Sequence, residues 1–389
     1  MQNVVGIICE YNPFHKGHKY QIDQIRKEIP DATIVAIMSG NIVQRGEMAI
    51  IDKYDRAQIA LECGVNAVFE LPYPYSGSTA EVFARAGVDI AHKLCCEYLY
   101  FGTESKDIFE LEKIAELIDS AEFEKAISNE MENKSKSYIA CKESALLTLG
   151  YNVGNSANDL LAIEYIRAIK KKKLKLKYRA IKRVGAGYNS QEKCEIMSAS
   201  AIRKIFDETR KFVSVPNEAS ELYERAVRDG KVLDYTALAG IVHRDVLLHP
   251  SKISSAFDTT PEMVSLITKE AKKSRNSLEF YFSLSSKICT TARIKRSLLY
   301  SLFDIKRIAH YPSFTVFLGA DEKGKKYLNK IKKIKKIHII TKHSDGKNLC
   351  ATAKKDLERN YLVDGVHNTL LEKSTPAEDA YKNKPIIKK

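Results

Sequence analysis

Short apolar runs alternate with amphipathic stretches through the first two hundred residues. The apolar runs predict strands over Val4–Cys9, Thr33–Met38, Asn66–Glu70, Tyr98–Phe101 and Leu174–Ile181. The stretches between them predict helices over Gly17–Glu28, Asp52–Glu62, Ser78–Lys93, Ile108–Leu149 and Asn158–Lys171. Strands that are nearly all apolar and separated by helices are typical of a parallel sheet covered on both faces. We therefore expect a Rossmann-like α/β domain over residues 1–206.

The pattern changes after Phe206, where polar turns separate apolar positions at helical spacing. Four helices are predicted: Glu218–Arg228, Tyr235–Leu248, Pro261–Lys272 and Thr290–Phe303. We expect residues 207–389 to form a mainly α-helical second domain with a short α/β-like tail. That tail would hold a strand at Ile337–Thr341 and a helix from Ala353, and the basic residues Tyr381–Lys389 are expected to be poorly ordered.

Charge is the most informative part of the composition. The 389 residues include 63 Lys and Arg against 49 Asp and Glu, a net charge of +14. This excess favours nucleic acid as a partner, although a surface of solvated lysines would give the same composition. Two stretches concentrate the charge: Arg167, Lys170, Lys171, Lys172, Lys173, Lys175, Lys177 and Arg179 in one, and Lys323, Lys325, Lys326, Lys330, Lys332, Lys333, Lys335 and Lys336 in the other.

The remaining composition bears on location. No run of about 18 apolar residues predicts a membrane span, and the N-terminus reads as a core strand instead of a secretion signal. The eight cysteines include no CxxC pair and read as reduced thiols. We therefore expect a cytoplasmic protein with no membrane partner.

The strongest chemical signal follows the first strand. The strand leads into a turn at Asn12 and Pro13 and then into a helix that begins near Gly17. Free N–H groups and the positive end of the helix dipole would meet there, which suits phosphate. Gly17 would let a nucleotide approach the backbone, and His15 and His18 would donate hydrogen bonds to phosphate oxygens. Two surface histidines at a helix start are the plainer alternative.

This His-x-Gly-His element resembles the signature of the nucleotidyltransferase superfamily, and a second signature of that superfamily resembles the segment Met197–Arg203. Ser198 and Ser200 would stand at the start of a helix, with Arg203 one turn later. Together they would hold β- and γ-phosphates. A serine N-cap beside a surface arginine is the alternative.

A closer resemblance extends over the N-terminal half. The segments Ile8–Tyr20, Ser39–Glu47, Asp52–Arg56, Phe69–Pro72, Phe101–Ser105, Asn158–Ile166, Ile181–Asn189 and Ser198–Lys204 are similar to motifs of the bacterial tRNA(Met) cytidine acetate ligase family. The segment Thr291–Arg296 matches it more loosely. The resemblance implies an enzyme that uses ATP to activate acetate as acetyl-adenylate. The acetyl group then passes to the exocyclic amine of the wobble cytidine of elongator tRNA(Met).

The resemblance also implies which residues contact ATP. They are Ile7, Ile8, Cys9, Glu10, Tyr11, Asn12, Pro13, Phe14, His15, Lys16, Gly17, His18, Lys19, Tyr20, Gly102, Asn158 and Arg183. Gly102 would admit the adenine or ribose, Asn158 would offer its amide to them, and the guanidinium of Arg183 suits phosphate. A turn glycine, an N-cap and a surface arginine are the alternatives. The expected catalytic residues are His15, His18, Arg183, Ser198, Ser200 and Arg203.

Other candidates leave two interpretations open. The loop Ser39–Glu47 is a candidate wall of an acyl pocket or an ordinary loop. Asp52, Lys53 and Arg56 would position phosphates or the acid, or would only cap and decorate a helix. With the resemblance, the two basic stretches become candidate tRNA contacts, and Arg293, Lys295 and Arg296 on a helix form a third such group.

The expected co-substrate is ATP. Whether Mg²⁺ accompanies it is left open, because no Asp and Glu cluster announces a metal site, and the residues do not indicate an oligomeric state. Two other functions also stay open. One is an adenylyltransferase acting on a small molecule, which would not need a large basic helical domain. The other is a non-catalytic tRNA-binding protein, against which the intact histidine and serine motifs argue.

Overall fold

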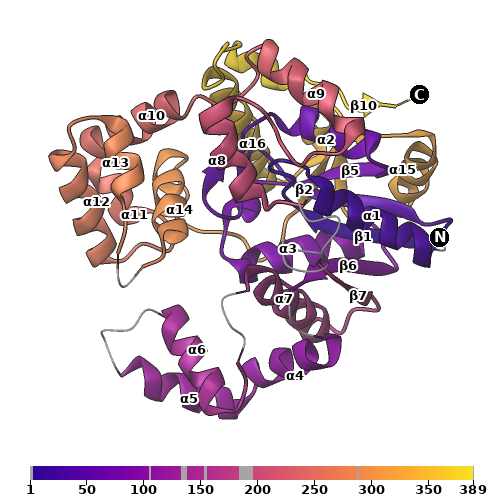
Figure 1. The fold of residues 1–389 in the computed structure, drawn as a ribbon, viewed down its shortest axis with the longest axis horizontal. Helices are drawn as coiled ribbons and strands as arrows, with labels where there is room; N and C mark the ends of the chain where they lie inside the picture. The colour runs from indigo at the N-terminus through magenta and orange to yellow at the C-terminus, as the bar shows by residue number, and fades with distance from the viewer. Residues whose placement is uncertain are drawn as a thin grey trace.

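One eight-stranded sheet organises the protein, in the order β10-β8-β5-β2-β1-β6-β7 with β9 beside β8. The computed structural model describes residues 3–104, 107–132, 138–152, 156–183, 196–286 and 289–388 (Figure 1). The parallel strands are β1 (Val4–Cys9), β2 (Thr33–Ser39), β5 (Ala67–Leu71), β6 (Tyr98–Thr103) and β7 (Lys177–Lys182). Their order, third-second-first-fourth-fifth along the chain, is that of a doubly wound Rossmann-like sheet. The predicted fold class is therefore confirmed.

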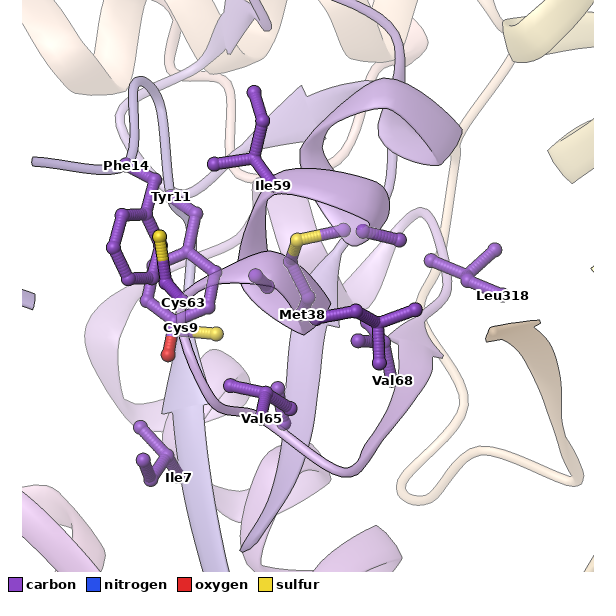
Figure 2. Packing of buried hydrophobic residues seen from close by; sticks show 14 of the residues in the cluster. Ile7, Cys9, Tyr11, Phe14, Met38, Ile59, Cys63, Val65, Val68 and Leu318 are labelled. Atoms are coloured by element: carbon purple, nitrogen blue, oxygen red, sulfur yellow. The ribbon is translucent and has the colours of Figure 1, made fainter. Parts of the chain in front are cut away.

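Both faces of this sheet are covered, which explains why its strands are almost entirely apolar. Alternate residues of β1 enter different cores, with Val4 and Ile8 on one side and Val5, Ile7 and Cys9 on the other. The first core is completed by α3 (Ala80–Lys93), α7 (Ala157–Lys171) and α15 (Glu322–Ile334). The second core, part of which is shown in Figure 2, is completed by α1 (Lys16–Glu28), α2 (Lys53–Glu62), α9 (Asn217–Arg228) and α16 (Ala351–Thr369).

The predicted helical region over Ile108–Leu149 is divided. It forms α4 (Ile108–Ile118), α5 (Ala121–Met131) and α6 (Tyr138–Thr148). Ser120 starts α5, because its side chain accepts a hydrogen bond from the backbone N–H of Phe123. Between β2 and α2 lies a small hairpin, β3 (Ile42–Val43) and β4 (Glu47–Met48), which the sequence pattern does not reveal.

Helices α10 to α14 pack at one side of the molecule (Figure 1), around a third core that also takes in Ile42 and Met48 of the β3–β4 hairpin and Val363 of α16. They are α10 (Tyr235–Leu248), α11 (Pro250–Ser255), α12 (Pro261–Lys273), α13 (Ser277–Ser283) and α14 (Thr291–Leu302). The predicted helical character is confirmed, and the short helices α11 and α13 are additional. Among the parts of the chain that the structure describes, every helix is too short or too polar to cross a bilayer.

The C-terminal segment returns to the sheet. Strand β8 (Phe314–Ala320) pairs antiparallel with β5, and β9 (His338–Ile340) and β10 (Ile386–Ile387) pair parallel with β8. The predicted strand near residue 337 and the helix near residue 353 are present, whereas β8 was not predicted. The expectation of a poorly ordered end was wrong for Ile386 and Ile387, since Ile386 pairs with Gly319. The boundary at residue 206 stays a prediction, and strands from both sides of it share one sheet.

Candidate active site

A cavity of about 620 Å³ opens at the carboxyl ends of β1 and β6. These neighbouring strands are the first and fourth parallel strands along the chain, so the strand order reverses between them. Open α/β sheets bind ligands at this reversal, because the loops after the two strands diverge and leave a crevice. The cavity walls come from the end of β1, the first turns of α1 and α7, the end of β6, and α8 (Ala199–Thr209).

Most of the predicted site residues meet in this cavity. Those that line it are Ile8, Cys9, Glu10, His15, Gly17, His18, Tyr20, Gly102, Asn158, Arg183, Ser198, Ser200 and Arg203. Those that do not are Ile7, Tyr11, Asn12, Pro13, Phe14, Lys16 and Lys19. Three residues of the second group, Ile7, Tyr11 and Phe14, are buried in the core that Figure 2 shows in part, and so support the turn between β1 and α1. The side-chain oxygen of Asn12 accepts a hydrogen bond from the backbone N–H of Ile50.

The two histidines are locked by the backbone of their own helix start. Nδ1 of His15 accepts from the backbone N–H of Gly17 at 3.0 Å, and Nδ1 of His18 accepts from that of His15 at 3.2 Å. Their rings stack with centroids 3.8 Å apart. Because each Nδ1 is an acceptor, each neutral ring carries its proton on Nε2. Burial, together with the charge of Arg183, lowers the pKa of His15 to about 3.

The pKa of His18 also lies well below the ordinary histidine value, because of burial and then the neighbouring His15 and Arg183. Both rings are therefore neutral hydrogen-bond donors at physiological pH. Gly17 has a role that differs from the one expected. A Cβ there would lie 2.8 Å from Cε1 of His15, so the glycine makes room for an imidazole of the protein itself.

The second predicted motif forms the start of α8. The hydroxyl of Ser198 accepts from the backbone N–H of Ala201 and caps the helix, and that of Ser200 accepts from Nη1 of Arg45 at 3.2 Å. Arg203 donates from Nη1 to the backbone carbonyl of Asn12 at 2.6 Å. Its guanidinium therefore fastens α8 to the turn before α1. Serine hydroxyls and an arginine thus line the cavity near the two histidines.

The other wall joins β6, β7 and α7. A Cβ on Gly102 would lie 3.2 Å from Cγ of Arg183, so this glycine lets the arginine stem cross β6. The side-chain amide of Asn158 donates a hydrogen bond to the carboxylate of Glu104. The backbone N–H of Glu104 in turn donates to the carboxylate of the buried Asp159 at 2.8 Å. The space predicted for a nucleotide at Gly102 is thus partly filled by the Arg183 side chain.

Several cavity residues were not predicted. They are Gln21, Ala80, Phe83, Phe101, Glu104, Ala157, Leu160, Leu161, Tyr165, Ile181, Ile196 and Ala199. The helical spacing of Asn158, Leu161 and Tyr165 is a signal that could have indicated one cavity face of α7. Gln44 and Arg45 belong to the loop Ser39–Glu47, so two of its residues do form a wall of the cavity.

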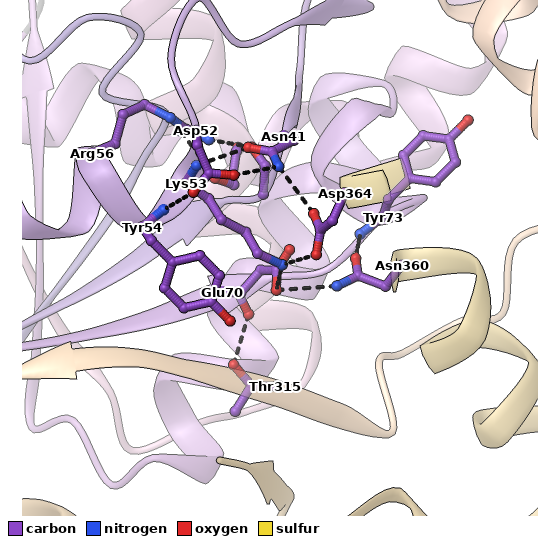
Figure 3. Close-up of polar contacts among 12 residues, drawn as sticks. Asn41, Asp52, Lys53, Tyr54, Arg56, Glu70, Tyr73, Thr315, Asn360 and Asp364 are labelled. Carbon is purple, nitrogen blue, oxygen red and sulfur yellow. Dashed lines mark hydrogen bonds and ion pairs between the residues drawn. The ribbon is translucent and has the colours of Figure 1, made fainter. Parts of the chain in front are cut away.

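The candidates at the start of α2 have structural roles instead (Figure 3). Asp52 caps α2 by accepting from the backbone N–H of Tyr54. Lys53 is fully buried, with Nζ 2.8 Å from Glu70 and 2.5 Å from Asp364. Arg56 donates to backbone carbonyls, including those of Glu10 and Gly40. The cavity wall includes none of the three.

The basic groups differ in how many of their side chains are paired with carboxylates. In the first stretch, Arg167, Lys170, Lys172 and Lys177 each form an ion pair with a carboxylate. In the third group, Arg293 pairs with Asp258, Lys295 pairs with Glu47, and Arg296 donates to the carbonyl of Gln44. The second stretch lies on α15 and beyond. Its exposed members are Lys323, Lys326, Lys330, Lys332, Lys333, Lys335 and Lys336.

The sheet order and the histidine-lined cavity at the start of α1 together define an α/β protein of the nucleotidyltransferase type. A family model described as HIGH Nucleotidyl Transferase matches residues 1–383. The tRNA(Met) cytidine acetate ligase of Fusobacterium nucleatum subsp. nucleatum is 33% identical over 346 residues, which cover 86% of each protein. That of a Thermoanaerobacter species is 36% identical over 371 residues, covering 90% of this chain and 91% of the relative.

A solved structure is similar over the same length. Thermotoga maritima TmcAL bound with alpha-thio ATP aligns with a TM-score of 0.89 and 26% identity over 99% of both chains. The chain therefore belongs to the HIGH nucleotidyl transferase family and, within it, to the tRNA(Met) cytidine acetate ligases.

Proposed function

We propose that this protein uses ATP to activate acetate as acetyl-adenylate and transfers the acetyl group to the exocyclic amine of the wobble cytidine of elongator tRNA(Met). The family name, tRNA(Met) cytidine acetate ligase, describes this reaction, and the Thermotoga relative binds an ATP analogue. The observation that carries the proposal is the cavity at the strand-order reversal, where two neutral histidines and Arg203 surround the start of α1.

The first step is adenylation. Acetate is an unreactive acyl donor because oxide would have to leave from its carbonyl carbon. When a carboxylate oxygen of acetate attacks the α-phosphorus of ATP, pyrophosphate leaves and the acyl group gains AMP as a good leaving group. The Nε2–H groups of His15 and His18 supply fixed donors for phosphate oxygens whose charge grows during this attack. Arg183 and Arg203, which also line the cavity, supply positive charge.

The second step transfers the acetyl group. The amine nitrogen of the cytidine attacks the carbonyl carbon of acetyl-adenylate, and AMP leaves with the electron pair of the broken C–O bond. The protein accelerates this step by alignment, since both reactants are held in one cavity. The exposed lysines of α15 are candidates for contacts with tRNA phosphates outside the cavity.

The side chains that the structure describes offer few ligands for a metal ion that would assist this reaction. Within the described ranges, no three His, Cys, Asp or Glu side chains gather as a metal site. A Mg²⁺ ion would therefore be held mainly by the ATP phosphates and water, as this ion prefers. The cytoplasmic location stays a prediction.

Mass spectrometry of tRNA nucleosides tests the proposal directly. The full chain is incubated with ATP, isotopically labelled acetate and a transcript of elongator tRNA(Met). We expect one cytidine that carries the labelled acetyl group, and none when ATP is omitted. Labelled cytidine in the absence of ATP, or acetate-independent exchange of pyrophosphate into ATP, would contradict the proposed chemistry. Adenylation of a small molecule without change to the tRNA would favour the adenylyltransferase alternative.

A further inference from the structure

Glu10 lies in the segment that the resemblance assigns to ATP contacts, but its carboxylate has no chemical role in the activation step proposed above. It directly follows β1 and lines the cavity wall. Its Oε1 accepts a hydrogen bond from the backbone N–H of Gln44 at 2.8 Å. Its Oε2 has no hydrogen-bond or ion-pair partner within the part of the chain that the structure describes. One oxygen is thus anchored and the other remains available to a ligand in the cavity.

The acetyl transfer requires a proton acceptor, whereas the activation step does not. Acetate already carries the negative charge with which it attacks phosphorus. The exocyclic amine of cytidine, in contrast, is a poor nucleophile because its lone pair is delocalised into the ring. It must lose a proton as its nitrogen bonds to the acetyl carbon, and a positioned base accelerates such a step.

The histidines cannot accept this proton. Each Nδ1 already accepts a backbone N–H, and each Nε2 carries the proton of the neutral ring. Their depressed pKa values make them weaker bases still. The thiol of Cys9 is also unsuited, since burial raises its pKa far above the ordinary cysteine value.

Two further groups on the wall are less suited than Glu10. Glu104 is exposed and its carboxylate is engaged by the amide of Asn158. Tyr165 is buried, which raises its pKa and keeps it protonated. The arginines on the wall are permanent cations. Glu10 is therefore the carboxylate best placed to act as a base.

We propose that Glu10 is the general base of the acetyl-transfer step, an inference that rests on the proposed function. As the new C–N bond forms, the proton of the amine passes to Oε2 of Glu10. The C–O bond to the phosphate breaks, and its electron pair leaves with AMP. No oxidant, reductant or further co-reactant is needed.

The surroundings of Glu10 suit this role. Burial raises its pKa, and this effect exceeds the opposing effects of the Gln44 N–H, Arg203 and Arg45. A carboxylate with a raised pKa is a stronger base, and it works best when its pKa approaches the operating pH. The bond from the Gln44 N–H holds Oε1 of Glu10 in place, and Gln44 is itself held by a side-chain bond to the carbonyl of Ser78 at 3.1 Å.

The test separates the two half-reactions in Glu10→Gln. Glutamine keeps an oxygen for the Gln44 N–H but cannot take up the proton, so folding is preserved while the base is lost. Glu10 also lines the ATP cavity, so acetate-dependent exchange of pyrophosphate into ATP should weaken in this variant, but at least about tenfold less than transfer does. Transfer from supplied acetyl-adenylate to the tRNA transcript should fall about 10²–10⁴-fold. Equal losses in both half-reactions, or an unchanged transfer rate, would overturn the inference.

A pH profile and matched variants sharpen the result. Wild-type transfer should increase with pH as Glu10 ionises, and Glu10→Gln should lose this dependence. Glu10→Asp, which keeps a displaced carboxylate, should recover part of the rate together with the dependence. Glu116→Gln on the surface of α4 is the neutral control. A selective loss of transfer in Glu104→Gln instead of Glu10→Gln would assign the base to Glu104. If the wild type performs neither half-reaction, the proposed function fails, whatever Glu10 does.

Discussion

Glu47 and Arg203 form an ion pair, with Nη2 of the arginine 3.2 Å from Oε2 of the glutamate. The other carboxylate oxygen of Glu47 lies 2.7 Å from Nζ of Lys295 on α14. One side chain of the β3–β4 hairpin therefore joins α8, which lines the cavity, to the helical unit α10–α14. Burial would raise the pKa of Glu47, but Lys295 and Arg203 outweigh it, and the pKa lies below the ordinary glutamate value.

Replacing this carboxylate by Glu47→Gln should loosen Arg203 without removing it. We expect a several-fold higher KM for ATP in the exchange reaction with a smaller change in kcat, because the guanidinium must then be ordered by the ligand. Loss of a charged partner at a largely buried position should also lower the free energy of unfolding by about 1–3 kcal/mol. Urea denaturation measures that change. Unaltered KM and stability would show that the pair positions nothing.

The stability difference should itself depend on pH. A carboxylate with a depressed pKa stabilises the folded state above its unfolded pKa, which is about 4.3 for glutamate. The contribution is lost as the pH falls through the lower pKa of the folded state. The wild type should therefore approach Glu47→Gln in stability below about pH 4, and a gap that widened there would contradict the assignment of the shift.

His18→Ala should abolish exchange of pyrophosphate into ATP. Loss of one preorganised donor to a developing oxyanion costs about 10²–10³-fold in rate, and His18 also accepts the backbone N–H of His15 at the helix start. The measurement is acetate-dependent exchange at saturating ATP, with circular dichroism to establish that the fold is kept. Wild-type exchange in this variant would place the phosphate site elsewhere.

The neutral state of the histidines gives a second prediction, for pH. Since the pKa of His15 is about 3 and that of His18 is also depressed, wild-type exchange should show no step near pH 6.5. In the unfolded chain both histidines take up a proton below about pH 6.5, whereas in the folded protein they stay neutral. The free energy of unfolding should therefore decline as the pH falls below about 6.5. A step in exchange at pH 6.5 that disappears in His15→Ala would show that the charged ring is the active form.

Gly17→Ala tests the packing of the His15 ring. The new methyl group would lie 2.8 Å from Cε1 of His15, so the ring must shift and its Nε2–H would no longer point as it does. We expect strong loss of exchange with a stability cost of about 1–3 kcal/mol. Gly240→Ala in α10 is a matched control, because its Cβ meets nothing within 4 Å. It should leave exchange unchanged and stabilise the helix by up to about 1 kcal/mol.

Much of the fold could be predicted because it is local. Fully apolar runs such as Val4–Cys9 and turns before helix patterns identify strands and helices without any knowledge of their partners. Strand β8, with the sequence FTVFLGA, is an almost fully apolar run of the same kind and was missed. What the local pattern could not predict is its antiparallel pairing with β5, which joins segments more than 240 residues apart. The structural role of Lys53 could not be predicted for a similar reason, because its partner Asp364 is 311 residues away in the sequence.

The candidate site could likewise be predicted where its residues are contiguous in the sequence, but not where they come from distant segments. The motif around His15 and His18 is contiguous, so its place at the start of α1 follows from the strand and helix that flank it. The partners of Arg203 depend on how a hairpin folds back onto the cavity, and the pattern of apolar residues gives no indication of Glu47. Charge density likewise does not separate paired from free lysines, since that depends on where the carboxylates fall.

The lysines at the end of α15 and at its C-cap supply the last prediction. Lys332 and Lys335 are exposed, and no ion pair or hydrogen bond engages their side chains within the described residues. The double variant Lys332→Ala/Lys335→Ala should retain exchange, because both residues lie outside the cavity wall. Its tRNA affinity should fall at low salt, and the slope of log K against log salt should decrease by up to about two if both contact phosphates.

The matched control removes two lysines that already have partners. Lys252 is paired with Asp245, and Lys382 with Glu378 and Asp379, and neither belongs to the three candidate tRNA-binding groups. Lys252→Ala/Lys382→Ala changes the net charge by the same amount, so a general effect of charge would weaken tRNA binding equally in both double variants. Direct contact by α15 predicts a larger loss and a larger change of slope for Lys332→Ala/Lys335→Ala. Equal slopes in the two variants and the wild type would exclude α15 from the tRNA interface, because a lysine that binds phosphate must release counterions when it does so.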